Sequence, residues 1–228
     1  MKKKYVETAE YTWDTIADSF DATRKKPWVE CIDFAERQNE KKVLLDVGCG
    51  NGRHLIPSSE HYENSIGLDI SIELLKIIQN KIREKEIKNI TLLKSNAIEI
   101  PLKNSYVNTA LYIAALHNIK KRKNRVQSLK EIKRVLTDQG KAMITVWSRW
   151  QDKFREHFTD KKAEKGEEFG DIHVSWRQNG YDIPRFYHLY SRDEFIEDIE
   201  TAGFKILDVQ DKKIVSKKHP DNYFAVVK

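Results

Sequence analysis

Five short apolar runs, separated by segments with helical periodicity, constrain the fold of this 228-residue chain more than any other feature. Between the runs, apolar residues recur at helical spacing, most clearly in SIELLKIIQNKIREKE and RVQSLKEIKRVLTDQG, where Gly140 is a plausible C-cap. Alternating strands and helices predict an α/β fold with a parallel sheet and helices on both faces. The runs, each typical of a buried strand, are VLLDV, SIGLD, TLLKS, TALYIAA and KAMITVW.

The two ends of the chain add elements to this core. An apolar face on residues 9–20 predicts a first helix, and Pro27 suits the first turn of a second. At the other end, SRDEFIEDIETAG predicts a helix, and KILDVQD and NYFAVVK predict an antiparallel pair of strands. Residues 148–190 are polar, aromatic and irregular, so we interpret them as an insertion, which beside a sheet is usually functional.

Charge and apolar content narrow the classes of protein. With 41 Lys and Arg against 35 Asp and Glu, the net charge of +6 permits a polyanionic partner without requiring one. The basic start lacks the apolar stretch of a signal peptide, and no run approaches the length of a membrane span. Cys31 and Cys49 are too few for a disulfide framework or a four-ligand zinc site. We therefore expect a cytoplasmic protein without a metal or membrane partner.

A glycine-rich loop follows the first predicted strand in VLLDVGCGNGRH. Its G-x-G-x-G spacing differs from the dinucleotide fingerprint, and Asp46 beside it would repel a phosphate but suit an ammonium or sulfonium cation. Asp69 ends the second strand, where an acid accepts hydrogen bonds from ribose hydroxyls. Together these features predict a nucleoside ligand with a positively charged, phosphate-free tail. Pro57 should shorten or kink the helix after the loop.

The motifs LLDVGCGNG, GLDIS and SNAIEIPL, in this order, resemble the class I S-adenosylmethionine-dependent methyltransferases. The resemblance implies a Rossmann-like fold with a seven-stranded, mostly parallel sheet and S-adenosyl-L-methionine as cofactor. Asn96 stands where that family more often has Asp, and its amide can still donate to and accept from the adenine edge. The implied cofactor-binding residues are Trp13, Asp46, Gly48, Gly50, Gly52, Asp69, Ile70, Asn96, Ala97 and Ala114.

Four further segments, WDTIADSFDATRKKPW, AALHNI, DIHVSW and PRFYHLYSRDEF, are similar to the tRNA wobble-uridine carboxymethyl methyltransferases. Those enzymes esterify the carboxylate of 5-carboxymethyluridine at the wobble position of tRNA, often with a small zinc-binding activator protein paired to a sheet edge. The resemblance implies catalytic roles for His117, Arg24 and Arg185. It implies substrate contacts by Lys26, Trp28, Trp147, Asp171, Trp176, Tyr187 and His188.

The same resemblance assigns a role to each part of the chain. Residues 1–40 would form a lid over the cofactor site, residues 41–147 with 191–228 the cofactor-binding core, and residues 148–190 a substrate-recognition insertion. Two positions depart from the family. Asn118 replaces the second of a His pair, and Trp13 replaces a tyrosine, keeping a stacking plane and losing the hydroxyl.

The chemistry of esterification agrees with these residue types. A carboxylate is ionised at neutral pH, so its methylation requires correct positioning against the methyl donor and no strong general base. Arg24 and Arg185 offer planar forks for a carboxylate, and His117 offers a hydrogen bond.

Several alternatives remain open at this point. The acceptor could be a small carboxylate or hydroxyl compound, or the chain could be a non-catalytic binding subunit. His117 could be a core or capping histidine, and the aromatics of residues 148–190 could form a satellite core. The basic run at residues 118–134 could be a solvated helix face.

Overall fold

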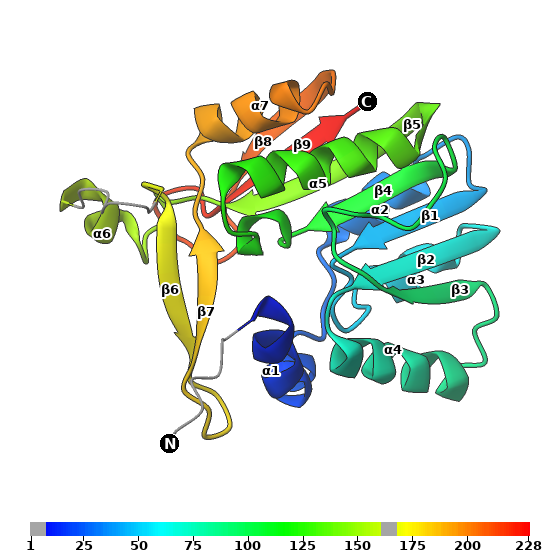
Figure 1. Cartoon of the computed structure of the whole chain (residues 1–228), viewed down its shortest axis with the longest axis horizontal. Helices are drawn as coiled ribbons and strands as arrows, with labels where there is room; N and C mark the ends of the chain where they lie inside the picture. Colours follow the sequence, from blue (N-terminus) through cyan, green and yellow to red (C-terminus); the bar gives the residue numbers. More distant parts are fainter. Residues whose placement is uncertain (1–7, 161–167) are drawn as a thin grey trace.

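A seven-stranded sheet lies at the centre of the computed structural model, which describes residues 8–160 and 168–228 (Figure 1). Its strands are β1 (Val43–Val47), β2 (Asn64–Asp69), β3 (Ile90–Lys94), β4 (Val107–Ile113), β5 (Leu136–Trp147), β8 (Ile206–Lys212) and β9 (Asn222–Val227). The order is β3-β2-β1-β4-β5-β9-β8. The pairs from β3 to β5 are parallel, whereas β9 runs antiparallel to both β5 and β8. The predicted mostly parallel sheet with an antiparallel C-terminal pair is confirmed.

Helices cover both faces of this sheet, as its apolar strands require. They are α1 (Ala9–Thr23), α2 (Val29–Glu36), α3 (Leu55–Ser59), α4 (Ile72–Glu84), η1 (Leu116–Asn118), α5 (Arg122–Val135), α6 (Arg155–Asp160) and α7 (Arg192–Thr201). One core joins α5 and α7 to the sheet through Leu129 and Phe195. The other joins α2, α3 and α4 to the opposite face through Phe34, Leu55 and Ile78. Every residue of β1 and β4 is buried between the two cores.

Three local predictions can be compared with the structure. Helix α3 has only five residues and contains Pro57, so the expected shortening is confirmed. The expected C-cap at Gly140 is wrong, because α5 already ends at Val135 and the next residue is extended and pairs with Val107 in the sheet. Pro27 precedes the N-cap of α2, Trp28, instead of lying in the first turn.

Outside the main sheet, β6 (Asp171–Trp176) and β7 (Ile183–His188) form an antiparallel hairpin. In Figure 1 this hairpin stands beside α1, away from the main sheet. Side chains alternate between its faces, so Arg185 and Tyr187 share one face and Phe186 and His188 the other. The expected insertion at 148–190 therefore contains regular structure, and its residues 161–167 lie outside the described part of the chain, as do residues 1–7 of the expected lid. Within the described ranges, no helix is long and apolar enough to cross a membrane.

Candidate functional site

A cavity of about 820 Å³ opens at the C-terminal ends of β1, β2 and β4, lined by residues of α1, the hairpin β6–β7 and the glycine loop. Ligands of open α/β folds bind at this edge of the sheet. The lining includes most of the residues expected from the sequence. These are Trp13, Arg24, Trp28, Gly48, Gly50, Asp69, Ile70, Asn96, Ala97, Ala114, His117, Trp147, Arg185 and Tyr187.

The glycine loop forms one wall of the cavity through an unusual backbone. Gly48, Gly50 and Gly52 have φ angles of 67°, 56° and 78°, in the left-handed region that favours glycine. A Cβ atom at Gly48 would lie 2.5 Å from the Cβ of Ala115, so a larger residue would also collide with the loop after β4. Gly52 turns the chain below the surface and does not line the cavity.

Asp69, at the end of β2, fixes this loop while facing the cavity. Its Oδ2 accepts a hydrogen bond from the Gly50 N–H at 2.8 Å, and its Oδ1 accepts one from the Ser71 N–H at 2.9 Å. Burial raises the pKa of Asp69, and these backbone donors oppose the rise. The carboxylate keeps acceptor capacity beyond these backbone bonds, which a ribose hydroxyl can use.

Asp46 lies beneath the loop and does not line the cavity, although it was expected to contact the ligand. It is 2% exposed, and its Oδ2 has no hydrogen-bond partner among the described residues. Burial, followed by the Asp69 carboxylate, raises the pKa of Asp46 to about 8, against the influence of Arg53. A buried carboxyl oxygen without a partner fits a ligand that brings a positive charge to the loop.

Helix α1 closes the cavity above this loop and is held there by its acidic residues. Asp14 Oδ1 accepts hydrogen bonds from the Ser71 hydroxyl at 2.6 Å and from the Glu73 N–H at 3.2 Å, at the start of α4. Asp21 accepts hydrogen bonds from Lys81 and Asn51, at 2.5 and 2.8 Å. Carboxylates at a helix N-terminus also interact favourably with its dipole. The helix therefore joins α4 to the glycine loop.

His117, in the 3-10 turn after β4, is held in one tautomer. Its Nδ1 accepts a hydrogen bond from the Trp147 N–H at 3.0 Å, so a neutral ring carries its proton on Nε2. The ring is 1% exposed and lies beside the stacked rings of Trp147 and Tyr187, with centroids 5.3 and 5.4 Å away. Burial, followed by the charges of His188 and Arg185, lowers its pKa to about 3. His117 is thus a neutral hydrogen-bond donor at neutral pH, unsuited to act as a cationic acid.

Arg24 and Arg185 meet over one indole ring at the hairpin end of the cavity. Their guanidinium carbons lie 5.4 and 4.7 Å from the centroid of Trp176. The Trp176 indole N–H donates to the Ser19 hydroxyl at 2.9 Å, which joins the hairpin to α1. Arg185 is 7% exposed, its Nε has no partner among the described residues, and burial lowers its pKa. Trp176 itself does not line the cavity, so it supports these arginines from behind.

Trp28 anchors the chain between α1 and α2. Its ring stacks on Phe224, with centroids 5.4 Å apart, and its backbone N–H donates to His54 Nε2 at 3.2 Å. Burial, followed by the charge of Arg53, lowers the pKa of His54 to about 3, which keeps the ring neutral and able to accept this bond. Lys26, two residues earlier, is exposed and does not line the cavity.

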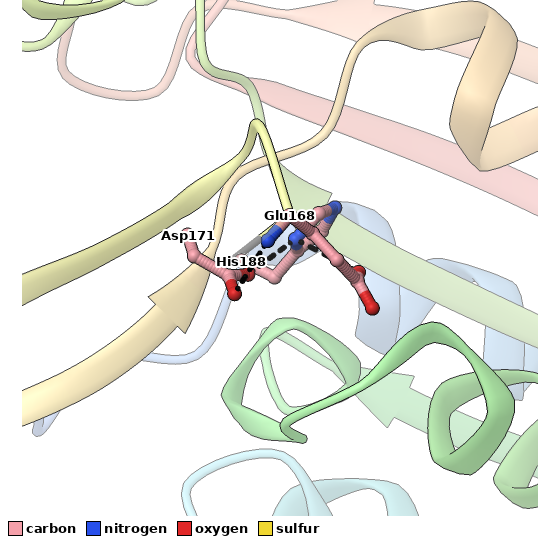
Figure 2. A group of neighbouring side chains, drawn as sticks. All are labelled: Glu168, Asp171 and His188. Atoms are coloured by element: carbon pink, nitrogen blue, oxygen red, sulfur yellow. Dashed lines mark hydrogen bonds and ion pairs between the residues drawn. The ribbon is translucent and has the colours of Figure 1, made fainter. Parts of the chain in front are cut away.

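Asp171 and His188 also lie away from the cavity, in the cluster that Figure 2 shows with Glu168. His188 Nδ1 lies 2.7 Å from Asp171 Oδ1 and 3.5 Å from Glu168 Oε2, and its Nε2 lies 2.7 Å from Glu194 Oε1. Burial alone would lower the pKa of His188, but the bonds to Asp171 and Glu194 outweigh it and raise the pKa. Carboxylates beside both ring nitrogens therefore favour the cationic form of His188.

The cluster continues into α5 and α7 as a buried network. Glu168, Asp171 and His188 are ligand types for a metal ion, with ligand atoms within 4.8 Å of one another. Ion pairs already occupy them, because Arg125 Nη2 lies 2.5 Å from Glu168 Oε2 and both His188 nitrogens face carboxylates. With His188 protonated, four acids face four cations, and Arg122 also pairs with the exposed Glu197. The acids are Glu168, Asp171, Glu194 and Asp198, and the cations are Arg122, Arg125, Arg149 and His188.

Two features of the site were missed or misread from the sequence. Arg53 follows the last glycine directly and lines the cavity, and its position beside an acid-lined loop is the signal that could have identified it. The basic run at 118–134 is only partly a solvated face, since Arg125 is fully buried in the network. Lys120 and Asn124 from the same run reach the cavity.

Comparison with known proteins places this geometry in context. The family model described as a methyltransferase domain matches residues 45–144. The chain is 30% identical over 198 residues to ECU09_1500 of Encephalitozoon cuniculi, which is named as a methyltransferase, covering 86% of each protein. It is 29% identical over 216 residues to the tRNA (carboxymethyluridine(34)-5-O)-methyltransferase of Schizosaccharomyces pombe, covering 86% of this chain and 88% of that protein.

Solved structures agree on the fold. An S-adenosylmethionine-dependent methyltransferase of Methanosarcina mazei superposes with a TM-score of 0.73 at 19% identity, covering 89% of this chain and 97% of that one. The protein bound to the Trm112 methyltransferase activator of Haloferax volcanii superposes with a TM-score of 0.71 at 13% identity, covering 96% of each chain. At these identities the likeness concerns the fold alone.

Proposed function

The chain belongs to the S-adenosylmethionine-dependent methyltransferases, and we propose that it esterifies the carboxylate of 5-carboxymethyluridine at the wobble position of tRNA. The fold and the cofactor class follow from the family. The acceptor is the proposed part. Its support is the relative in Schizosaccharomyces pombe, whose name states this activity, together with the chemistry of the cavity.

The residues of the cofactor end fit S-adenosylmethionine. Gly48 and Gly50 allow close approach to the loop backbone, Asp69 offers acceptors for ribose hydroxyls, and Asn96 with Ala97 lines the part of the cavity assigned to adenine. The unpartnered oxygen of Asp46 provides negative charge near the cationic tail. When bound, S-adenosylmethionine supplies a methyl group on a sulfonium and leaves as S-adenosylhomocysteine.

One observation carries the choice of acceptor: the buried Arg185 guanidinium faces the cavity without an acidic partner among the described residues. A guanidinium pairs best with a carboxylate or phosphate, and leaving it buried and unpaired is costly. Arg24 lies over the same indole ring, that of Trp176, so a second guanidinium is near. A hydroxyl acceptor would leave both charges without a counter-ion. These contacts favour an anionic acceptor group over the small hydroxyl compounds considered above.

The proposed mechanism depends on position. The acceptor carboxylate is already ionised, so one oxygen forms a bond to the methyl carbon as the carbon–sulfur bond breaks, and no proton moves. Arg185 and Arg24 orient that carboxylate, and the His117 Nε2–H can donate to it or to the neighbouring uracil carbonyl. Because the pKa of the protonated ring is about 3, the neutral His117 ring is a weak base and does not take up a proton during the reaction.

The outer parts of the chain have proposed roles in recognition. Residues 8–40 act as a lid, since α1 lies over the glycine loop, and Lys26 is an exposed cation suited to a tRNA phosphate. Trp147 and Tyr187, stacked 4.8 Å apart, form the apolar wall near the acceptor. The hairpin β6–β7, within 148–190, carries Arg185 and serves as the substrate-recognition element.

Partners and location follow from the same proposal. A complex with the Trm112 activator is described for the structural neighbour from Haloferax volcanii, and we propose that a small activator of that kind pairs with an edge of this sheet, at β3 or β8. We expect the protein to work in the cytoplasm, where it would meet tRNA.

Incubation of the protein and cofactor with tRNA that carries 5-carboxymethyluridine tests this function, in the presence and absence of an activator. Nucleoside mass spectrometry should show the methyl ester at the wobble position and no product from tRNA with unmodified uridine there. Affinity for tRNA should fall steeply with salt, because phosphate contacts release counter-ions. Carboxylated tRNA that stays unmethylated while a small carboxylate is methylated would refute the proposal.

A further inference from the structure

Three arginine side chains line the cavity and form no salt bridge with a described residue: Arg53, Arg24 and Arg185. Among residues 8–160 and 168–228, none of the three forms a salt bridge, and the side chain of Arg24 donates only to the Thr23 carbonyl at 3.5 Å. The buried arginines elsewhere behave differently. Arg125 and Arg149 both pair with carboxylates. The cavity therefore holds three guanidiniums that are not salt-bridged to any described carboxylate, which indicates anionic groups on the ligands.

The three guanidiniums, named here the arginine row, lie over two indole rings, that of Trp28 near the glycine loop and that of Trp176 in the hairpin. Arg53 follows Gly52 and stacks on Trp28, with its carbon 5.2 Å from the ring centroid. Arg185 lies at the other end over Trp176, and Arg24 reaches the same indole. Burial lowers the pKa of both end arginines, and the charge of Arg24 lowers each of them further, so Arg24 lies within electrostatic reach of both.

The arginine row offers a guanidinium to each of the two carboxylates that the reaction brings into the cavity, one on the cofactor and one on the acceptor. The methionine part of S-adenosylmethionine carries an ammonium and a carboxylate, and the methionine end is assigned to the glycine loop. There, Asp46 and Arg53 are close enough for each to shift the pKa of the other, although they form no salt bridge. The acceptor of the proposed function carries a second carboxylate, which must lie close to the transferred methyl group and hence to the methionine part.

We propose that Arg53 binds the methionine carboxylate of the cofactor, that Arg185 binds the carboxylate of the acceptor, and that Arg24 lies between the two and contacts both. The assignment of Arg53 rests on the cofactor alone, whereas the assignment of Arg185 rests on the proposed function. Two carboxylates then neutralise most of the charge on three guanidiniums. Without this neutralisation, two anions side by side would repel each other at the moment of transfer.

Isothermal titration with S-adenosylmethionine and with its decarboxylated form tests the cofactor half. The two ligands share adenosine, sulfonium and ammonium and differ in the carboxylate. The full chain should prefer S-adenosylmethionine by at least about tenfold. Arg53→Gln should remove this preference by weakening binding of S-adenosylmethionine alone. Arg83→Gln, at an exposed arginine of α4, is the matched control and should change neither affinity.

Two results would overturn this assignment. Equal weakening of both ligands would show that Arg53 only supports the loop, and an unchanged preference would show that another group binds the carboxylate. If Arg53→Gln does not unfold cooperatively on heating, Arg53→Met keeps the apolar stem over Trp28 and is read by the same criterion.

Methyl transfer to carboxylated tRNA tests the other half. Arg185→Gln should leave the preference between the two cofactor forms intact and lower turnover at least about tenfold, while Arg24→Gln should lower both the preference and turnover. Loss of the cofactor preference in Arg185→Gln would contradict the order of the row. If the wild-type chain methylates no carboxylated tRNA, the proposed function fails, and the titration result for Arg53 stands or falls separately.

Discussion

Asp46 lies beneath the glycine loop with 2% of its surface exposed, and burial followed by the Asp69 carboxylate raises its pKa to about 8. The loop is thus built around a carboxyl group that holds its proton in the absence of a cation. His117 and His54 show the opposite shift, since burial lowers the pKa of each to about 3. At the residue scale, the site contains groups that burial keeps neutral and arginines that remain charged.

Asp46→Asn should stabilise the protein in the absence of cofactor at pH 7.5. The folded carboxyl titrates near 8 and the unfolded one near 3.8, so the free energy of unfolding falls as the pH rises between these values. Asparagine does not titrate, so the variant does not lose this stability as the pH rises. Thermal unfolding should give a higher midpoint for the variant at pH 7.5 and a smaller difference at pH 4, with weaker cofactor binding throughout. A variant that is less stable than the wild type at every pH would contradict the shifted pKa.

The turnover of His117 variants should separate hydrogen bonding from acid–base catalysis. His117→Ala should lower the maximal rate at least about tenfold, because a positioned donor is lost. The shape of the pH profile between pH 6 and 8 should stay the same, since the pKa of His117 is about 3. A wild-type profile with a rise near pH 6.5 that disappears in the variant would assign His117 a proton-transfer role and contradict this account.

Only part of the residue-level site follows from the sequence. Gly48 and Asp69 are readable because Gly48 directly follows, and Asp69 ends, a strand that the local pattern predicts, and both line the cavity. Asp171 and His188 are not readable in the same way, because their partner Glu194 comes from α7 and is brought in by the tertiary fold. The sequence places Arg53 beside the loop, but only the structure shows that Arg53 lines the cavity without a salt bridge to a described residue.

At the scale of elements, α1 depends on polar contacts more than its position at the start of the chain suggests. Glu10 pairs with Lys94 at 2.5 Å, Asp14 binds the first turn of α4, and Asp21 binds Lys81. These contacts keep the helix over the glycine loop. They therefore link α1, which closes the cavity, to α4, which begins shortly after Asp69.

Asp14→Ala should weaken cofactor binding by several-fold. The change removes hydrogen bonds to the Ser71 hydroxyl and the Glu73 N–H, a loss comparable to that of a helix cap, about 1 kcal/mol. Isothermal titration measures the affinity. Asp18→Ala, at an exposed acid of the same helix, is the control and should bind cofactor like the wild type. Equal affinities for all three proteins would show that α1 does not contribute to closure.

The stability of the fold around the hairpin β6–β7 should depend on whether His188 is protonated. Its pKa is raised in the folded state, so its contribution to stability is full below the unfolded value of 6.5 and is lost as the pH rises through the folded value. His188→Gln should thus lower the free energy of unfolding by about 1–3 kcal/mol at pH 6 and by less at pH 9. Denaturant unfolding at both values measures this. A cost that grows with pH would contradict a cationic His188.

Over the whole molecule, the sheet was predictable and the hairpin was not. The strands from β1 to β5 are apolar runs joined by short local connections, so alternation predicts their parallel arrangement. Leu136 shows where this prediction fails. Its sequence pattern continues the preceding helix, but its pairing with Val107 places it in β5, which is therefore longer than the apolar run. The residues of β6 and β7 are stabilised by contacts to α1 and α7, such as Trp176 with Ser19, and no local pattern records those.

The location of the transferred methyl group decides whether this protein forms an ester at the wobble uridine. The protein is incubated with carboxylated tRNA and cofactor labelled in the methyl group, and the tRNA is then treated with mild alkali before nucleoside mass spectrometry. An ester at the wobble uridine predicts labelled methyl ester before this treatment, and labelled methanol with restored 5-carboxymethyluridine after it. A label that survives alkali on a base or a ribose, or that is absent from the wobble nucleoside, would contradict the account.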